Sequence, residues 1–180
     1  IVAIICFIPY LRDIFNKQTK PHAYSWLIWT ILQTVGFSVQ LKSGAGYGSW
    51  ALVVGAIFCL TIFILSFKYG TRNITKFDTA CLFASLIAIV FYLFLENLLW
   101  TITLVVIIDF IGFLPTFRKG WEEPLTETTS TFALSALANL LSLFALQNYT
   151  VTTVPYMASL FITNFSFVVM ILIRKQKIKH

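Results

Sequence analysis

An aspartate in the middle of an apolar run is the residue of this chain best suited to chemistry. Asp109 follows LVVII and precedes FIGFLP, inside the apolar stretch 98–117. Placing an aspartate at the centre of a membrane helix costs about 2.5–3.5 kcal/mol, and such acids commonly serve ion pathways or proton relays. We therefore expect Asp109 to contact a substrate and to couple transport to a proton. The alternative is a buried structural acid that is hydrogen-bonded to a neighbouring helix.

Three amide side chains have a similar setting. Gln33, Asn139 and Asn164 each lie near the middle of another apolar stretch. Polar side chains at this depth usually face a bundle interior or a water-filled cavity, and transporters bind their substrates there. We predict that the three amides bind a small polar metabolite together with Asp109. The alternative is that they form hydrogen bonds between helices and so hold the bundle together.

Two tryptophans near the start of the stretch 24–41 are candidates for the mouth of such a cavity. Trp26 and Trp29 lie three residues apart, close to one helical turn. Of the two, we assign Trp29 to the substrate site. Tryptophan is also common in the interfacial belts of membrane proteins, and that location is the alternative for both.

Two prolines occur at equivalent places in similar segments. Pro9 lies in CFIPYLRDIF and Pro115 in DFIGFLPTFRKGW, each three residues before an arginine, and the two segments are 106 residues apart. A single proline kinks or ends a helix. Two prolines at matching positions favour a paired hinge, so we predict hinges at Pro9 and Pro115.

Residue sets for catalysis or metal binding are missing from the apolar stretches of the sequence. We find no Ser-His, Cys-His or metal-ligand combination at membrane depth, so we expect no enzyme, no metal and no cofactor. The cysteines are odd in number and widely spaced, which fits neither a disulfide framework nor a metal site. We predict that all three are small buried apolar residues: Cys6, Cys59 and Cys81.

The composition predicts an all-α integral membrane protein in a lipid bilayer. Hydrophobic residues make up 58% of the chain and charged residues 11%, whereas soluble domains carry about 25% charged residues. Most of seven apolar stretches are long enough to cross a bilayer as a helix. The first is short, so we expect the chain to continue before Ile1. The stretches are 1–11, 24–41, 50–67, 77–95, 98–117, 130–147 and 154–173.

Basic residues gather on one side of these spans. The loops after the first, third and fifth stretches and the tail hold 12 Lys and Arg residues, and the opposite loops hold only Lys42. The positive-inside rule therefore places the N-terminus outside and the C-terminus in the cytoplasm, with a bacterial inner membrane as the expected location. Topology thus explains the net charge of +6 without nucleic-acid binding. In one cytoplasmic loop we expect a solvated acidic cluster, Glu122, Glu123 and Glu127.

The chain contains an internal repeat. Residues 7–68 overlay residues 113–174 without a gap, and Gln33 then matches Asn139. Three spans separated by one extra span give two copies of the same orientation, related by an axis along the membrane normal. We predict a three-helix bundle at 1–68, a linker helix at 69–96, and a second bundle with a basic tail at 97–180.

This three-plus-one-plus-three layout resembles the PQ-loop superfamily, which includes the SWEET sugar transporters. The segment PYLRDIFNKQTKPHAYSW is similar to the family's motif, with Pro9, Lys20 and Ser25 in the family's order, and residues 115–132 are similar more weakly. Tyr10 and Thr116 occupy the positions of the motif's glutamine. The resemblance implies a solute transporter, and some members of the superfamily are driven by protons.

The resemblance also bears on the substrate. The sugar site of the SWEET family uses one asparagine on the third helix and one on the seventh. Here Asn164 matches the second, but Phe58 holds the position of the first. This difference argues against a sugar as the substrate.

Two functional hypotheses follow. The first is a small-solute transporter that works by alternating access, its two bundles rocking about the proline segments. The second is a receptor or membrane-complex subunit that binds a peptide, lipid or protein partner without transport, because a fold alone does not fix function. Substrate-driven flux in liposomes separates the two. The sequence leaves both a monomer and a homo-oligomer open.

Overall fold

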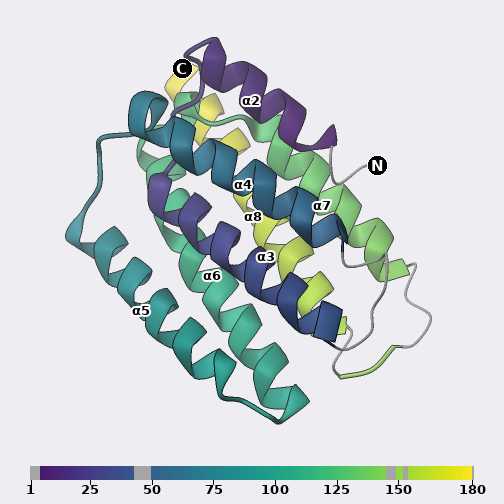
Figure 1. Cartoon of the computed structure of the whole chain (residues 1–180). Coiled ribbons are helices and arrows are strands. Elements are labelled where there is room, and N and C mark those ends of the chain that lie inside the picture. Colours follow the sequence, from purple (N-terminus) through teal and green to yellow (C-terminus); the bar gives the residue numbers. More distant parts are fainter. Residues whose placement is uncertain (1–4, 43–49, 145–148, 152–153, 180) are drawn as a thin grey trace.

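The computed structural model describes residues 5–42, 50–144, 149–151 and 154–179. Within these ranges the chain is helical and contains no strand, which confirms the all-α prediction. Figure 1 shows the helices side by side in one bundle. They are α2 (Phe7–Phe15), α3 (Ala23–Lys42), α4 (Trp50–Tyr69), α5 (Lys76–Leu93), α6 (Leu98–Glu122), the short 3-10 helix η2 (Pro124–Thr126), α7 (Thr129–Phe144) and α8 (Val154–Lys179).

Four helices are long and apolar enough to cross a membrane, which supports an integral membrane protein. The spans are Leu52–Tyr69 in α4, Lys76–Leu93, Leu98–Glu122 and Val154–Ile178 in α8, while α7 is a shorter apolar helix. Large apolar side chains remain exposed on their outer faces, including Phe67 (74% exposed) and Phe91 (64%). Extensive exposed apolar surface is unfavourable in water and suits contact with lipid tails.

The predicted boundaries agree with the helices at most starts and differ clearly at three ends. The starts of α3 to α8 fall within one residue of the predicted stretches. However, α2 continues to Phe15 rather than stopping at residue 11, α6 continues to Glu122 rather than 117, and α8 continues to Lys179 rather than 173. All three extensions contain charged residues that find partners in the fold, so their charge does not end the helix. Residues 1–4 lie outside the described part of the chain.

The two prolines lie inside helices and do not end them. α2 continues six residues beyond Pro9, and α6 continues seven residues beyond Pro115. Pro115 removes one backbone hydrogen bond to the residue four positions earlier, whereas Pro9 is the third residue of α2, where an N–H would have no partner within the helix. Pro115 is buried and Pro9 is half-buried. The helix-ending alternative is therefore wrong for both, and the hinge role stays a prediction.

Side-chain caps fix the starts of α5 and α6. Thr75 and Asp78 form a reciprocal capping box, in which the Asp78 carboxylate accepts the Thr75 backbone N–H at 2.7 Å. The Asn97 side chain accepts the backbone N–H of Leu99 at 3.0 Å. Such caps satisfy N–H groups that the first helical turn leaves without partners. The first cap lies in the loop from α4 to α5, and the second lies in the turn from α5 to α6.

The helices pack in an order that differs from their order in the chain. α6 contacts α3, α5 and α8, while α4 lies along α3 and α7 lies along α8 (Figure 1). Glycine allows α6 to approach α3 closely, because a Cβ at Gly112 would lie 2.8 Å from Cγ2 of Ile28. The contacts of α2 with both α4 and α7 bring the first described helix beside the second half of the chain.

Candidate functional site

A cavity of about 400 Å³ lies between the helices. Its lining comes from α2, α3, α4, α6, α7 and α8. All five residues that the sequence analysis assigned to substrate binding line this one cavity: Trp29, Gln33, Asp109, Asn139 and Asn164. The structure thus brings together side chains up to 135 residues apart in the chain. Their binding of a solute stays a prediction.

Asp109 is buried in the wall of this cavity without a cationic partner. Its side chain belongs to a residue that is 3% exposed, and Oδ2 makes no hydrogen bond within the described part of the chain. Side chains that interact with it include Trp29, Cys59 and Tyr156, from α3, α4 and α8. No Lys, Arg or His is among the described residues that line the cavity. The carboxyl is therefore available to a proton or to a ligand.

Each of the three amides donates a hydrogen bond to another group of the protein. Asn139 donates to the backbone oxygen of Ser135 at 2.8 Å, and Asn164 donates to that of Leu160 at 2.8 Å. Both bonds lie within one helix. Gln33 donates from Nε2 to the Cys59 sulfur at 3.2 Å, across from α3 to α4. Among the described contacts, the alternative of an interhelical bond is therefore found for Gln33 only.

Aromatic rings form a continuous wall at one side of the cavity. Trp29 contacts Trp26 and Phe113 with ring centroids 5.0 and 5.1 Å apart, and Phe113 contacts Phe132 at 5.9 Å. Trp26 is 3% exposed and donates its indole N–H to the Tyr10 hydroxyl at 3.3 Å. The interfacial-belt alternative is therefore wrong for Trp26. Trp29 is half-buried beside the Asp109 carboxyl.

The cysteines behave as predicted. All three are buried and form no disulfide among the described residues, and two of them, Cys6 and Cys59, line the cavity. Phe58 is not among the described lining residues. Its ring stacks on Phe7 with centroids 4.9 Å apart.

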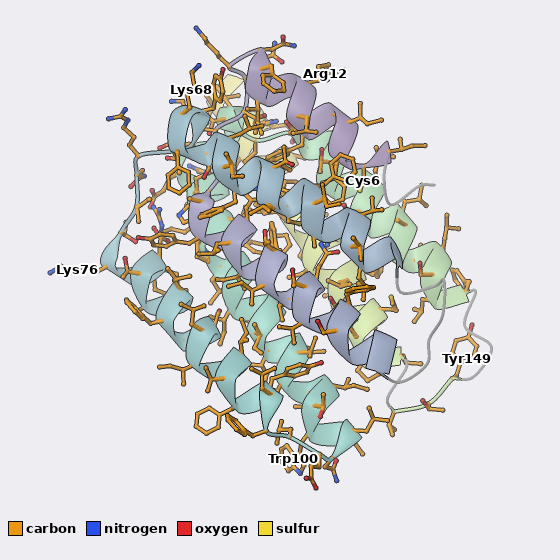
Figure 2. The ribbon with its side chains drawn as sticks, viewed as in Figure 1. Cys6, Arg12, Lys68, Lys76, Trp100 and Tyr149 are labelled. Atoms are coloured by element: carbon orange, nitrogen blue, oxygen red, sulfur yellow. The ribbon has the colours of Figure 1, made fainter. Side chains whose placement is uncertain are left out.

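Hydrogen bonds close one end of the bundle, which we call the basic end and define by the loops 16–22, 70–75 and 123–128. Figure 2 shows Arg12 and Lys68 at this end and Trp100 at the other. Here Thr128 donates its hydroxyl to Asp13 at 2.9 Å, and the backbone N–H of Lys20 donates to the Thr126 oxygen at 3.1 Å. These bonds join the first and second halves of the chain beyond the aromatic wall.

A buried ion pair lies beside these bonds. Lys119 Nζ is 2.8 Å from Glu127 Oε1, and neither side chain is exposed. Lys119 also donates to the Thr126 backbone oxygen at 2.7 Å, and Tyr10 points its hydroxyl at Glu127 Oε2 at 3.5 Å. The expectation that Glu127 belongs to a solvated cluster is therefore wrong, although Glu122 is exposed. Glu127 is buried because Lys119 offsets its charge.

A second buried polar group ties α5 to α6 and to the residue before α3. Arg118 grips the Asp78 carboxylate through two hydrogen bonds of 2.8 and 2.7 Å. His22 Nε2 lies 3.4 Å from Asp78 Oδ2, but neither ring nitrogen makes a hydrogen bond within the described residues. Burial lowers the pKa of His22 to about 4, although the Asp78 carboxylate acts in the opposite direction. The imidazole is therefore neutral at pH 7.

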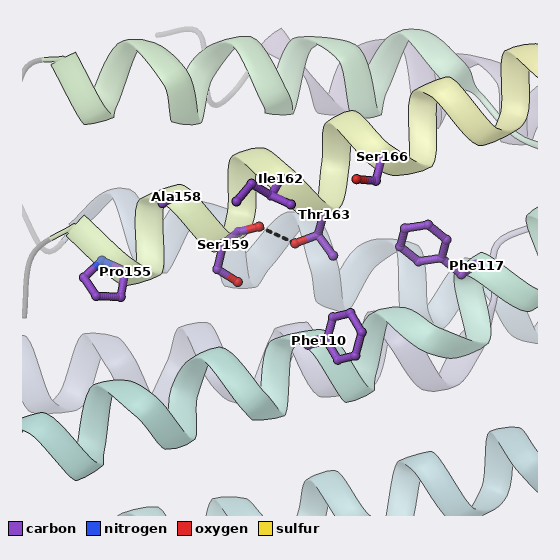
Figure 3. A pocket seen from close by; sticks show the side chains of 8 residues that line it. All are labelled: Phe110, Phe117, Pro155, Ala158, Ser159, Ile162, Thr163 and Ser166. Carbon is purple, nitrogen blue, oxygen red and sulfur yellow. Dashed lines mark hydrogen bonds between the residues drawn. The ribbon is translucent and has the colours of Figure 1, made fainter.

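A second hollow of about 360 Å³ lies between α6 and α8 (Figure 3). Its wall contains Phe110 and Ile162, both exposed on the outer surface of the bundle. The hydroxyl of Thr163 is bonded to the backbone oxygen of Ser159 in its own helix. The lining has no ionisable side chain. This hollow suits contact with lipid and offers no chemistry.

No sequence pattern pointed directly to the two buried charged groups at the basic end. Lys119 and Arg118 lie just after an apolar stretch, where charged residues usually reach water. Their partners, Glu127 and Asp78, lie in other segments and come close only in the folded chain.

Within the described residues no three His, Cys, Asp or Glu side chains come together as a metal site would require. No family model, curated protein or solved structure matches the chain.

Proposed function

We propose that this chain is a membrane transporter of the PQ-loop type that carries a small polar solute by alternating access. The observation that supports it most is the cavity between the helices, where the predicted polar residues meet around Asp109. Transporters bind their substrates between helical repeats near the middle of the membrane. A volume of about 400 Å³ lies within the range of small-molecule sites.

The helix arrangement is consistent with seven spans in two parallel repeats. α3 begins at Ala23 and α7 at Thr129, which reproduces the offset of 106 residues. In the proposed repeat α2 corresponds to α6 and α3 to α7. The contact of α2 with α7 then corresponds to the contact of α6 with α3, and both contacts occur. The contact of α3 with α4 likewise matches that of α7 with α8. We infer that α5 is the linker helix.

Closure at the basic end supports the alternating-access mechanism. The cavity lies between the aromatic wall and the ends of α4 and α8 that carry Leu52 and Tyr156. To release solute on the basic side, the halves must separate, and the Thr128–Asp13 and Lys20–Thr126 hydrogen bonds must break. Pro115 removes a backbone hydrogen bond from the interior of α6, and Pro9 lies in the first turn of α2. These two segments are the proposed hinges.

Orientation and coupling complete the proposal. The basic end faces the cytoplasm of a bacterial cell according to the positive-inside rule, so the cavity loads from the outer side. Asp109 is the proposed site of proton coupling because intramembrane carboxyls serve proton relays. Its lack of a described cationic partner leaves the carboxyl free to bind and release a proton.

Flux through proteoliposomes tests the proposal. Purified chain is reconstituted, and uptake is measured for a panel of labelled amino acids, amines, nucleosides, vitamins and sugars at pH 5.5 and 7.5. We expect saturable uptake of one class that depends on pH, and any uptake that Asp109→Asn retains should not depend on pH. Glu96→Gln, an acid-to-amide change at an exposed loop position, is the matched control. Tight binding without flux would instead support the receptor or subunit hypothesis.

A further inference from the structure

Several hydrogen-bond acceptors of the cavity have no partner among the described residues. Asn139 and Asn164 each use one N–H on their own helix, and their side-chain oxygens accept no hydrogen bond from the described residues. Gln33 directs Nε2 to Cys59, and its oxygen lies beside Gly55. Asp109 Oδ2 also has no partner among the described residues. A ligand with N–H or O–H donors can satisfy these acceptors.

The charge of the lining favours a particular charge on the ligand. Asp109 is the only carboxyl group among the described lining residues, and no cationic side chain lies among them. The Lys119–Glu127 and Arg118–Asp78 pairs lie at the basic end and already neutralise each other. An anionic ligand would be repelled by Asp109 in a low-dielectric site, whereas a monocation would be attracted.

Aromatic faces near Asp109 favour the same class of ligand. The Trp29 ring lies beside the carboxyl and contacts Phe113, and both line the cavity. The negative face of an aromatic ring attracts a cation, most strongly for tryptophan. Thr131 adds a buried hydroxyl that has no described hydrogen-bond partner and also lines the cavity.

We propose that this cavity binds a small organic monocation, a protonated amine. Its N–H groups donate to the Asp109 carboxylate and to the oxygens of Asn139 and Asn164, and its charge lies against the Trp29 ring. The inference rests on the proposed function, because it names the solute class of the same cavity. It accounts for the carboxyl without a described cationic partner, the amide oxygens without a described hydrogen bond, and the aromatic wall.

Three probes of similar size separate charge from shape. Benzylammonium, benzyl alcohol and benzoate share one aromatic ring and differ in charge, and each is titrated into the purified chain in micelles by calorimetry. We expect benzylammonium to bind at least about tenfold more tightly than benzyl alcohol, and benzoate not to bind. No saturable binding of benzylammonium at millimolar concentration overturns the proposal, as does equal or tighter binding of benzyl alcohol or benzoate.

Two variants locate the site. Asp109→Asn should remove the preference for benzylammonium over benzyl alcohol, whereas Glu96→Gln should keep it. Trp29→Leu leaves the carboxyl in place and should weaken benzylammonium several-fold, whereas Trp100→Leu, on the exposed outer surface, should not. The second pair decides the test if Asp109→Asn fails to fold. A preference that survives both cavity variants overturns the proposal.

Uptake measured in parallel keeps this inference distinct from the proposed function. Proteoliposomes that accumulate a neutral solute while micellar protein ignores benzylammonium would refute the amine site and retain the transporter. Specific binding of benzylammonium by a chain that moves no solute in the panel, amines included, would retain the amine site and refute the transporter.

Discussion

The buried ion pair at the basic end offers the sharpest test of the packing described above. Lys119 Nζ and Glu127 Oε1 are 2.8 Å apart, and both side chains are fully buried. Removing one partner of such a pair leaves an uncompensated charge and costs about 3–5 kcal/mol. We therefore expect Lys119→Met and Glu127→Gln each to destabilise the fold strongly.

The double variant should behave differently. Lys119→Met with Glu127→Gln removes both charges, so no unpaired charge remains and the loss should be clearly smaller than the sum of the single losses. We expect a coupling energy of about 2 kcal/mol or more between the two sites. Since 1 kcal/mol shifts Tm by about 2–4 °C in a chain of this size, each single variant should lower Tm by about 6–20 °C.

Thermal unfolding in detergent micelles, followed by circular dichroism, measures these shifts. Glu122→Gln is the matched control because its carboxylate is exposed at the same end of the bundle. Exposed ion pairs contribute at most about 1 kcal/mol, so this control should change Tm little. Additive losses in the double variant, or single losses below about 1 kcal/mol, would show that the pair is hydrated and that the basic end is open to water.

Two further predictions concern His22 and Gly55. Because the folded chain holds the pKa of His22 near 4 and the unfolded value is about 6.5, the unfolded state binds the proton first, so stability should fall by up to about 3 kcal/mol as pH drops through this interval. His22→Gln should remove that part of the pH dependence of Tm, and an unchanged slope would contradict the burial of a neutral imidazole. Gly55→Ala places a Cβ 1.9 Å from the Gln33 side-chain oxygen and should push the amide into the cavity, weakening benzylammonium several-fold in calorimetry with a stability change within about 1 kcal/mol. Gly36→Ala, whose Cβ would meet only Leu52 at 3.5 Å, is the matched control and should leave binding unchanged.

The amino-acid sequence by itself determined the elements of this protein. Hydropathy is a local property, and an apolar run ends where polar or turn-forming residues begin, so the starts of α3 to α8 followed from it to within one residue. The C-terminal ends of the helices were harder to predict. A charged residue such as Arg118 suggested the end of the apolar helix. The Asp78 carboxylate accepts hydrogen bonds from the Arg118 guanidinium, however, and α6 continues to Glu122.

The polar centre of the cavity was partly visible in the sequence. Four polar residues stood out because a polar side chain in a membrane span is costly unless it faces the bundle interior or a cavity. They are Asp109, Gln33, Asn139 and Asn164. That they share one cavity followed from equal depth in neighbouring spans. The free acceptors were not visible, since the direction of the Asn139 and Asn164 amides depends on bonds within their own helices.

Only the tertiary structure decided which charged residues are buried together. A helix that meets lipid on one side and protein on the other is apolar on both, so its sequence says little about which face turns inward. Rotation and packing of α6 against its neighbours therefore bring Lys119 to Glu127 and Arg118 to Asp78, beside His22. Each of these contacts depends on interhelical geometry, which local sequence patterns do not encode.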